Sequence, residues 1–240
     1  MTAIKTENLT KKFKDKIAVN CMDLSINHGE LFALLGTNGA GKTTTIKMLS
    51  GLILPTSGNI IIENTDMKKD VFKIKEILNV SPQETAIAPN LTVKENLEFM
   101  AGVYRIKDKD RKISELIEQF RLDEVLNKRA KTLSGGWQRK VSIAISLIND
   151  PKILFLDEPT LGLDVIARKE LWKVIEGLKG KITVILTTHY MEEAESLSDR
   201  IGIMAKGSLV AVGTAKELIE KTNTDNFEDA FVYIATGCEA

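Results

Sequence analysis

This sequence of 240 residues lacks long hydrophobic runs and a surplus of either charge, and it has only two cysteines. No stretch approaches the roughly 20 apolar residues that a helix needs to cross a bilayer, and the N-terminus lacks a signal peptide's apolar core. Basic residues number 33 and acidic residues 33, so the strongly basic surface of a nucleic-acid binder is not expected. We therefore expect a soluble, intracellular chain with no nucleic-acid partner, which could act at a membrane only through another protein.

The two cysteines, Cys21 and Cys238, are too few and too scattered for a disulfide framework or a metal site. We expect both to be unpaired thiols, as is usual in a cytoplasmic protein.

Apolar patterning predicts an α/β fold. Continuous apolar runs at 31–35, 152–156 and 182–186 have the length of buried strands. Segments with helical spacing lie between and after them, which indicates a mostly parallel sheet. Near the N-terminus apolar residues alternate instead, which predicts a half-exposed antiparallel sheet. Its expected short strands are 4–6, 17–19, 22–26 and 59–63.

A helical segment interrupts this core. From about 92 to 148 apolar residues recur at helical spacing, and Thr92 with Glu95 forms a capping-box pattern. We expect an inserted α-helical subdomain at about 84–150. Later elements should be one helix after His189, a hairpin around Lys206-Gly207, and a C-terminal extension at about 214–240. That extension should contain a helix near 227–234, and the whole chain, 1–240, is predicted to be a single domain.

A glycine-rich loop follows the first apolar run and precedes a helical segment. It fits the pattern G-x-x-x-x-G-K-S/T and comprises Gly36, Thr37, Asn38, Gly39, Ala40, Gly41, Lys42 and Thr43, with Thr44 next. The glycines let backbone N–H groups approach phosphate oxygens, and the helix N-terminus attracts anions. Lys42 can reach the β- and γ-phosphates, and the Thr43 hydroxyl can ligate Mg²⁺. Chance produces this pattern in about one chain of this size in a hundred, so we predict a triphosphate site.

Two carboxylates, Asp157 and Glu158, end the second apolar run. Ligand sites of α/β proteins lie at the carboxyl ends of parallel strands. One carboxylate could hold the magnesium shell while its neighbour polarises the attacking water. An acidic pair at a strand end is usually just solvated, but a phosphate loop earlier in the chain favours the functional interpretation.

Two further polar residues end strands. His189 follows the third apolar run, where its imidazole could bond the γ-phosphate or the attacking water. A lone histidine is more often structural. Gln83 closes a short strand before the helical subdomain, and by itself it indicates nothing.

The segment Leu133-Ser134-Gly135-Gly136 precedes the acidic strand and resembles the signature of the ATP-binding-cassette (ABC) ATPases. Other motifs of that family occur in the family's order along essentially the whole chain. They are Phe13 (A-loop), 36–43 (Walker A), Gln83 (Q-loop), 133–137 (signature), 153–158 (Walker B), 161–164 (D-loop) and His189 (H-loop). The resemblance implies an ATPase with ATP and Mg²⁺ as its ligands.

The resemblance also implies a role for each matched residue. Within one chain, Phe13 stacks on adenine and Val19 lines the same pocket. Thr43, Gln83 and Asp157 order Mg²⁺, Glu158 is the general base, and His189 is the γ-phosphate switch. Leu133, Ser134, Gly135, Gly136 and Asp164 act on the nucleotide of an opposite subunit, so the active form would be an ATP-sandwiched dimer.

Trp137 stands where the family most often has Gln, and Phe13 stands where Tyr is commoner. A bulky indole at position 137 could alter packing across the ATP-sandwiched dimer.

Lone cassettes of this size resemble the nucleotide-binding subunits of bacterial ABC transporters, whose membrane-spanning permease is a separate chain. Residues 188–195 and the C-terminal helices resemble the exporter branch of drug-resistance and sodium-extrusion cassettes. We expect a location at the cytoplasmic side of the cell membrane. The groove that binds the permease is expected near Gln83. Apolar residues at 87–91 are candidates for its lining, and packing in the core is an equally weighted alternative for them.

The rival functions are a soluble ABC ATPase in DNA repair or on ribosomes, and an isolated phosphate-loop kinase or GTPase.

Overall fold

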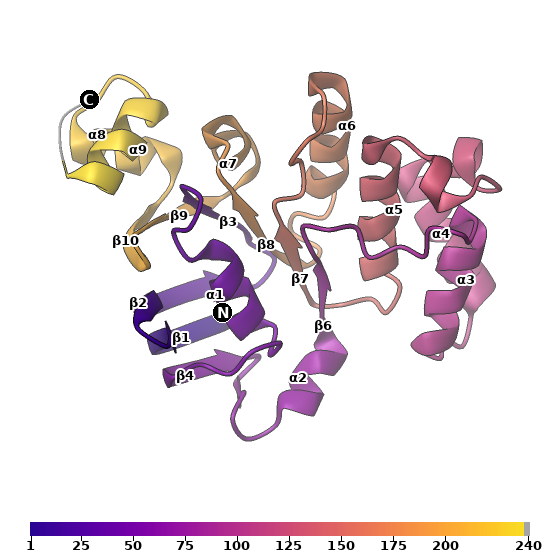
Figure 1. Ribbon diagram of the computed structural model, residues 1–240, viewed down its shortest axis with the longest axis horizontal. Coiled ribbons are helices and arrows are strands. Elements are labelled where there is room, and N and C mark those ends of the chain that lie inside the picture. Colours follow the sequence, from indigo (N-terminus) through magenta and orange to yellow (C-terminus); the bar gives the residue numbers. More distant parts are fainter. Residues whose placement is uncertain (238–240) are drawn as a thin grey trace.

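The central sheet has six strands in the order β10-β9-β3-β8-β7-β6 in the computed structural model, which describes residues 1–237 (Figure 1). The strands are β3 (Leu31–Gly36), β6 (Leu78–Ser81), β7 (Ile153–Asp157), β8 (Thr183–Thr188), β9 (Arg200–Ala205) and β10 (Ser208–Gly213). All neighbours are parallel except β9 and β10. The predicted α/β class with a mostly parallel sheet is confirmed, and each of the three apolar runs forms a strand buried along its length.

Successive residues of these buried strands serve two different cores, because neighbouring side chains of a strand point to opposite faces. In β3, Leu31, Ala33 and Leu35 belong to the larger cluster, which the helices cover. Phe32 and Leu34 belong to the smaller cluster, between the central sheet, α1 and a second sheet. A strand that is apolar at every position is therefore required here.

The second sheet is antiparallel, as predicted, with the strand order β2-β1-β4-β5. Its strands are β1 (Thr2–Phe13), β2 (Lys16–Asn27), β4 (Ser57–Ile62) and β5 (Thr65–Asp66). The prediction of separate short strands at 4–6, 17–19 and 22–26 was wrong: they belong to one long hairpin. Register shifts interrupt the β1–β2 pairing, and Asn8 and Cys21 have positive φ. Such bulges break the period of two from which strand ends were judged.

Nine α-helices and two short 3₁₀ helices lie within the described residues. They are α1 (Lys42–Leu49), α2 (Val71–Ile77), α3 (Val93–Val103), α4 (Lys109–Phe120), α5 (Gly135–Ser146), α6 (Val165–Glu176), α7 (Met191–Leu197), α8 (Ala215–Thr222), α9 (Phe227–Thr236), Asp123–Val125 and Ala130–Thr132. The capping box of Thr92 and Glu95 starts α3 as predicted. Helix α2 was not predicted, because only Ile74 of its seven residues is buried and a one-turn apolar face gives no period.

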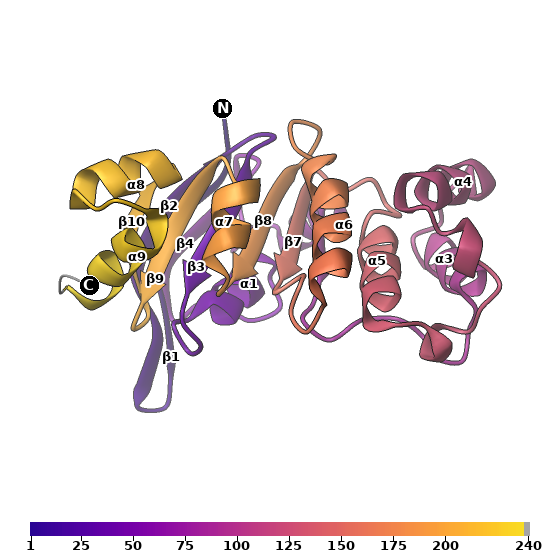
Figure 2. The same ribbon diagram turned by 90° about the horizontal axis from the view of Figure 1, so that it is seen from above.

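Helices α3, α4 and α5 gather at one end of the molecule, and α8 and α9 lie at the other (Figures 1 and 2). Helix α5 also contacts β6, so it joins the helical end to the sheet. Within residues 1–237 no helix combines the length and apolar character that a membrane crossing requires. Cys238 and the last residues of the predicted extension lie outside the described part of the chain.

Candidate active site

The site begins with the loop between β3 and α1, whose backbone only glycine could adopt at key points. Gly41 has a φ of 108°, and a Cβ added to it would lie 2.4 Å from the carbonyl oxygen of Ala18. Gly39 has a φ of 80°, and a Cβ there would meet no atom within 4 Å, so this glycine faces open space. No side chain caps the start of α1. The loop therefore offers free backbone N–H groups and a helix N-terminus to an anion.

Lys42 is folded back over this loop. Its ammonium donates to the carbonyl oxygens of Gly36 at 2.8 Å and Thr37 at 3.3 Å, and it lies 3.1 Å from Glu158 Oε1. The side chain is only 5% exposed. A cation held beside a nest of N–H groups makes the loop suitable for phosphate.

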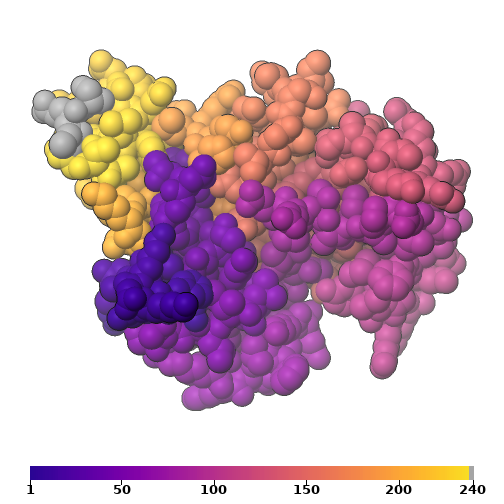
Figure 3. Space-filling model, in the orientation of Figure 1, coloured from indigo at the N-terminus to yellow at the C-terminus, as the bar shows by residue number. Residues whose placement is uncertain are grey.

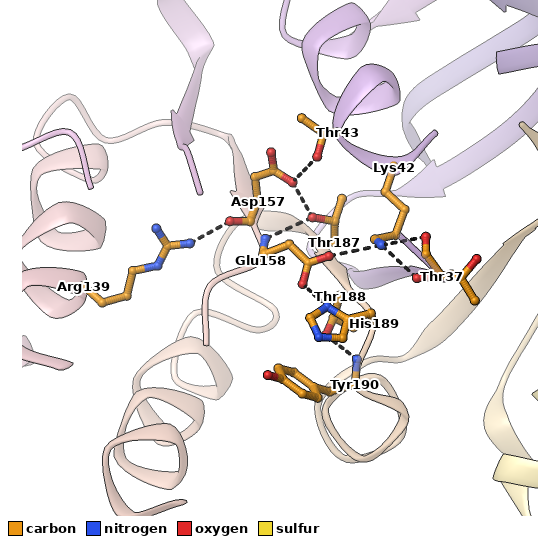
Figure 4. A network of polar contacts seen from close by, with 11 residues as sticks. Thr37, Lys42, Thr43, Arg139, Asp157, Glu158, Thr187, Thr188, His189 and Tyr190 are labelled. Carbon is orange, nitrogen blue, oxygen red and sulfur yellow. Dashed lines mark hydrogen bonds and ion pairs between the residues drawn. The ribbon is translucent and has the colours of Figure 1, made fainter. Parts of the chain in front are cut away.

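The carboxylates at the end of β7 have different surroundings (Figure 4). Asp157 Oδ1 accepts hydrogen bonds from the hydroxyls of Thr43 at 3.1 Å and Thr187 at 2.6 Å. Glu158 Oε2 lies 2.7 Å from Nδ1 of His189, so Glu158 bridges the lysine and the histidine. The strand order explains the meeting, because β3, β8 and β7 are neighbours and their carboxyl ends carry the loop, His189 and Glu158.

Glu158 has a φ of 48°, in the left-handed region. Such a backbone costs a non-glycine residue roughly 1–3 kcal/mol and is found most often at functional sites. Its N–H donates to the hydroxyl and the carbonyl oxygen of Thr187. These bonds to β8 help to hold the strained residue with its side chain toward Lys42.

A cavity of about 540 Å³ opens over the loop. It is lined by Phe13, Lys16, Ala18, Asn38, Gly39, Ala40, Gly41, Lys42, Thr43, Thr44, Gln83, Glu158, Leu161 and His189. Phe13 is 48% exposed, and the ammonium of Lys11 lies 5.0 Å from its ring centroid. The cavity thus joins an accessible aromatic ring to the phosphate loop, as a nucleotide requires.

Val19 differs from its predicted place. Its side chain is completely buried in the smaller core cluster, and the neighbouring Ala18 lines the cavity instead. Neighbouring side chains of a strand point to opposite faces, so the cavity and the core cannot both be lined by the same face of β2.

Two of the three residues predicted to order Mg²⁺ are in contact, namely Thr43 and Asp157. Gln83 is exposed at the rim of the cavity, and the only hydrogen bond it makes within the described residues is through its carbonyl oxygen, from Arg139. A hydroxyl and one carboxylate fit a magnesium ion that takes its other ligands from phosphates and water. Within residues 1–237 no group of three or more His, Cys, Asp and Glu side chains is placed to hold a metal alone.

The signature residues lie outside this cavity. Leu133 is buried, whereas Ser134 and Gly135 are exposed, and Ser134 caps α5 without a side-chain hydrogen bond. A Cβ on Gly136 would lie 3.0 Å from the Cβ of Ala167, so α5 passes close to the start of α6. Asp164 caps α6 by accepting from the N–H groups of Ile166 and Ala167 at 2.9 Å.

Trp137 is half-buried and lines a surface cavity with Lys140 and Glu170. Its indole packs against the larger core, and the ammonium of Lys140 lies 4.5 Å from the ring centroid. The expectation that a bulky indole here alters packing across a dimer stays a prediction.

The sequence interpretation missed two residues. Thr187 binds Asp157 and Glu158, and its place near the end of β8, two residues before His189, was an available signal. Arg139, 4% exposed in α5, bonds to the carbonyl oxygens around Glu158. The buried part of α5 also contains Lys140, Ser142 and Ser146, so no interruption of an apolar face marked Arg139 in the sequence.

Known proteins are similar to this chain in sequence and in structure. A family model described as "ABC transporter" matches residues 19–161. The "Probable multidrug ABC transporter ATP-binding protein YbhF" of Escherichia coli is 39% identical over 97% of this chain, but the chain spans only 42% of that protein. The "Linearmycin resistance ATP-binding protein LnrL" of Bacillus subtilis is 38% identical over 92% of the chain and 72% of its own length.

Among solved structures, the ATP-binding cassette MJ0796 is described as a dimer in a post-hydrolysis state with ADP and Pi. It superimposes with a TM-score of 0.78 at 27% identity, over 88% of this chain and 98% of the other. The fold observed here is therefore the fold of a cassette that binds nucleotide.

Proposed function

This chain belongs to the ABC transporter family of ATP-binding ATPases, and from that premise we propose that it hydrolyses ATP to drive an exporter through a separate membrane-spanning partner. The observation that carries the proposal is the contact of Glu158 with both Lys42 and His189 above the phosphate loop. Export is supported by the similarity to a drug-resistance protein. The names of the similar proteins give different cargoes, so we assign the choice of substrate to the membrane-spanning partner.

ATP binding begins with an exchange of partners at Lys42. Phosphate oxygens bind the ammonium and the loop N–H groups, and Glu158 Oε1 then loses its cationic partner. Phe13 stacks on the base at the accessible end of the cavity. Thr43 and Asp157, which are in contact, would hold Mg²⁺, and the ion would supply neutralisation of the phosphate charge.

Hydrolysis then requires a base beside the γ-phosphate. Glu158 accepts the proton of the attacking water while the new O–P bond forms and the bond to the β-phosphate oxygen breaks. His189 keeps Glu158 in position through its 2.7 Å contact and can donate to the γ-phosphate. Gln83, exposed at the rim of the cavity, would be the third residue to hold Mg²⁺.

A second cassette completes the site. The N-terminus of α5, at Ser134, is exposed and has no capping side chain, so it can receive the γ-phosphate of another chain. Val165 and Ile166, next to Asp164, are 62% and 74% exposed, as expected of apolar residues that a partner covers. The solved structure of MJ0796 is described as dimeric, which supports an ATP-sandwiched dimer here.

The permease docks on a groove between α2 and the end of α3 (Figure 3). This cavity of about 430 Å³ is lined by Phe72, Lys75, Glu76, Tyr104, Ile106 and Asn149. Phe72 is 80% exposed. The segment 87–91, expected to contribute, is held by the buried Asn96, and Ile87 packs on the larger core. Through this groove the chain is held at the cytoplasmic side of the membrane.

We propose the domain division on the same basis. Residues of about 84–150 form the helical subdomain that carries the signature, and residues from about 214 form an extension built on α8 and α9. The gathering of these helices at opposite ends of the molecule supports the division (Figure 2).

The decisive test is Glu158→Gln. It should lower kcat by about 10³-fold, because general-base catalysis contributes on the order of 10²–10⁴. ATP binding should persist, and light scattering with ATP should show a stable dimer. The exposed Glu192→Gln is the matched control and should hydrolyse at the wild-type rate. A Glu158→Gln protein with wild-type turnover contradicts the assigned base, and copurification with ribosomes or DNA instead of a polytopic membrane protein contradicts transport.

A further inference from the structure

Arg139 is a buried cation whose hydrogen bonds all go to the main chain. Its Nε donates to the carbonyl oxygen of Pro159 at 2.8 Å, and Nη2 donates to that of Asp157 at 2.7 Å. Its Nη1 donates to the carbonyl oxygens of Pro82 and Gln83. The guanidinium fork is suited to this task because it presents several donors in one fixed plane.

Burial of the charge is costly, and no salt bridge to a carboxylate offsets it among the residues described. Burial lowers the pKa of Arg139 to about 10, against the opposing effect of the Asp157, Glu193 and Glu158 carboxylates. The group therefore stays protonated at neutral pH. Replacement of buried charged groups by well-packed apolar side chains is often neutral or stabilising, so any role of Arg139 has to come from its particular contacts.

Two of these contacts lie on either side of Glu158. The carbonyl of Asp157 precedes Glu158 and the carbonyl of Pro159 follows it, while Glu158 itself has the left-handed φ of 48°. One rigid guanidinium thus binds the peptide before Glu158 and the peptide after Pro159, so it restrains the backbone on both sides of Glu158 and, through it, the direction of the Glu158 side chain. Figure 4 shows the bond to the carbonyl of Asp157.

The other two contacts lie on the loop after β6. Pro82 and Gln83 belong to the segment that leads into the helical end of the molecule, and Arg139 itself lies on α5, which begins at the signature residues. The same side chain therefore joins three parts that the reaction needs, namely the signature helix, the Gln83 loop and the base.

We propose that Arg139 is a positioning residue for ATP hydrolysis, which aligns Glu158 and the Gln83 loop with the signature helix. The inference rests on the proposed role of Glu158 as the base. A displacement of α5 relative to the sheet would move both groups together, so that hydrolysis depends on the position of the helical end.

The test compares Arg139→Met and Arg139→Lys with a matched control, Lys140→Met. Lys140 lies in the same helix and is similarly buried, but it binds Glu170 of α6 at 2.7 Å and contacts neither carbonyl pair. In Arg139→Met we expect kcat to fall about 100-fold and KM for ATP to stay within about threefold, since displacement of a reacting group by 1 Å costs about that much in rate. Arg139→Lys should recover about a tenth of wild-type kcat, because a single ammonium cannot span both carbonyl pairs.

Hydrogen exchange adds a readout that loss of stability alone would not change. Peptides covering 157–163 and 82–86 should exchange faster in Arg139→Met than in Lys140→Met, at a temperature where both variants are folded. If Arg139→Met does not fold, Arg139→Lys is the deciding variant.

A folded Arg139→Met or Arg139→Lys protein with kcat within about twofold of wild type overturns the proposal. So does an equal loss of kcat in Lys140→Met. Glu158→Gln measured in parallel separates the two failures: if it keeps wild-type turnover, the assigned base is wrong, and if it is inactive while Arg139→Met is not, only the role of Arg139 is wrong.

Discussion

The phosphate loop and the signature segment are both glycine-containing turns that lead into a helix, yet their surroundings differ. Around the loop, Lys42 is buried and bonded to two carbonyl oxygens and Glu158, inside a cavity with Phe13 at its other end. At the signature, Ser134 is exposed, makes no capping hydrogen bond and lines no part of that cavity.

The difference shows where each helix N-terminus finds its partners. The loop has its cation and its carboxylates from its own chain, because β3, β8 and β7 end side by side. Among the residues that the structure describes, the signature has no such cation or carboxylate bonded to it, although its N–H groups are chemically as suited to an anion. We infer that its anion comes from outside the chain, which is the reason to expect two composite sites in a dimer.

The largest expected effect concerns this division between subunits. Lys42→Ala removes the phosphate cation and Ser134→Glu places a negative charge opposite the phosphates, so each variant alone should lose about 10²–10³-fold in kcat. An equimolar mixture should regain activity, because a mixed dimer contains one site with both residues intact. The measurement is ATPase activity of the mixture against each variant.

Lys42→Ala mixed with the double variant Lys42→Ala/Ser134→Glu is the control, since no site in that mixture is intact. A mixture of the single variants that shows only the mean of their activities would contradict composite sites.

A smaller effect is expected at the accessible end of the cavity. Phe13→Ala should raise KM for ATP about 10-fold with little change in kcat, because stacking of a base on an aromatic ring contributes roughly 1–3 kcal/mol. Phe13→Tyr should keep the wild-type value, and Phe72→Ala, which removes a more exposed ring outside this cavity, should leave KM unchanged. Equal KM values for all three variants would contradict the stacking of Phe13 on the base.

The smallest effect concerns the free energy of unfolding, through the carboxylate of Glu193. Glu193 is completely buried on α7, where Trp172 Nε1 donates to its carboxylate at 3.0 Å. Burial raises the pKa of Glu193 above its ordinary value of 4.5. Between pH 4.5 and that raised pKa the folded protein binds more protons than the unfolded chain, so this group lowers the free energy of unfolding as pH rises.

Glu193→Gln should therefore be more stable than wild type above the raised pKa, with the gain vanishing as pH falls below about 4.5. Denaturant unfolding between pH 4 and 8 measures this, with Glu192→Gln as the exposed control. A gain in stability that is the same at every pH would show that Glu193 does not titrate as its burial requires.

Local pattern was sufficient to predict the phosphate loop, the buried strands and the class of fold. A strand, a glycine turn and a helix start are specified by residues within about ten positions of one another, through backbone conformation and hydrophobic period. Gly39 and Gly41 are in the conformations that the loop motif requires. The hairpin of β1 and β2 was less predictable, since its bulges at Asn8 and Cys21 break the period that sequence patterning measures.

Only the tertiary structure decided which distant groups meet. Glu158 contacts Lys42, and Thr187 contacts Asp157, because β7 and β3 both lie beside β8, an order that no short segment of sequence encodes. Val19 lies in the core instead of the cavity because of the face of β2 on which it stands. Arg139 bonds to the carbonyls around Glu158 only because α5 packs against the sheet at that height. The sequence therefore determined that a phosphate site exists, and the packing of strands and helices determined which side chains surround it.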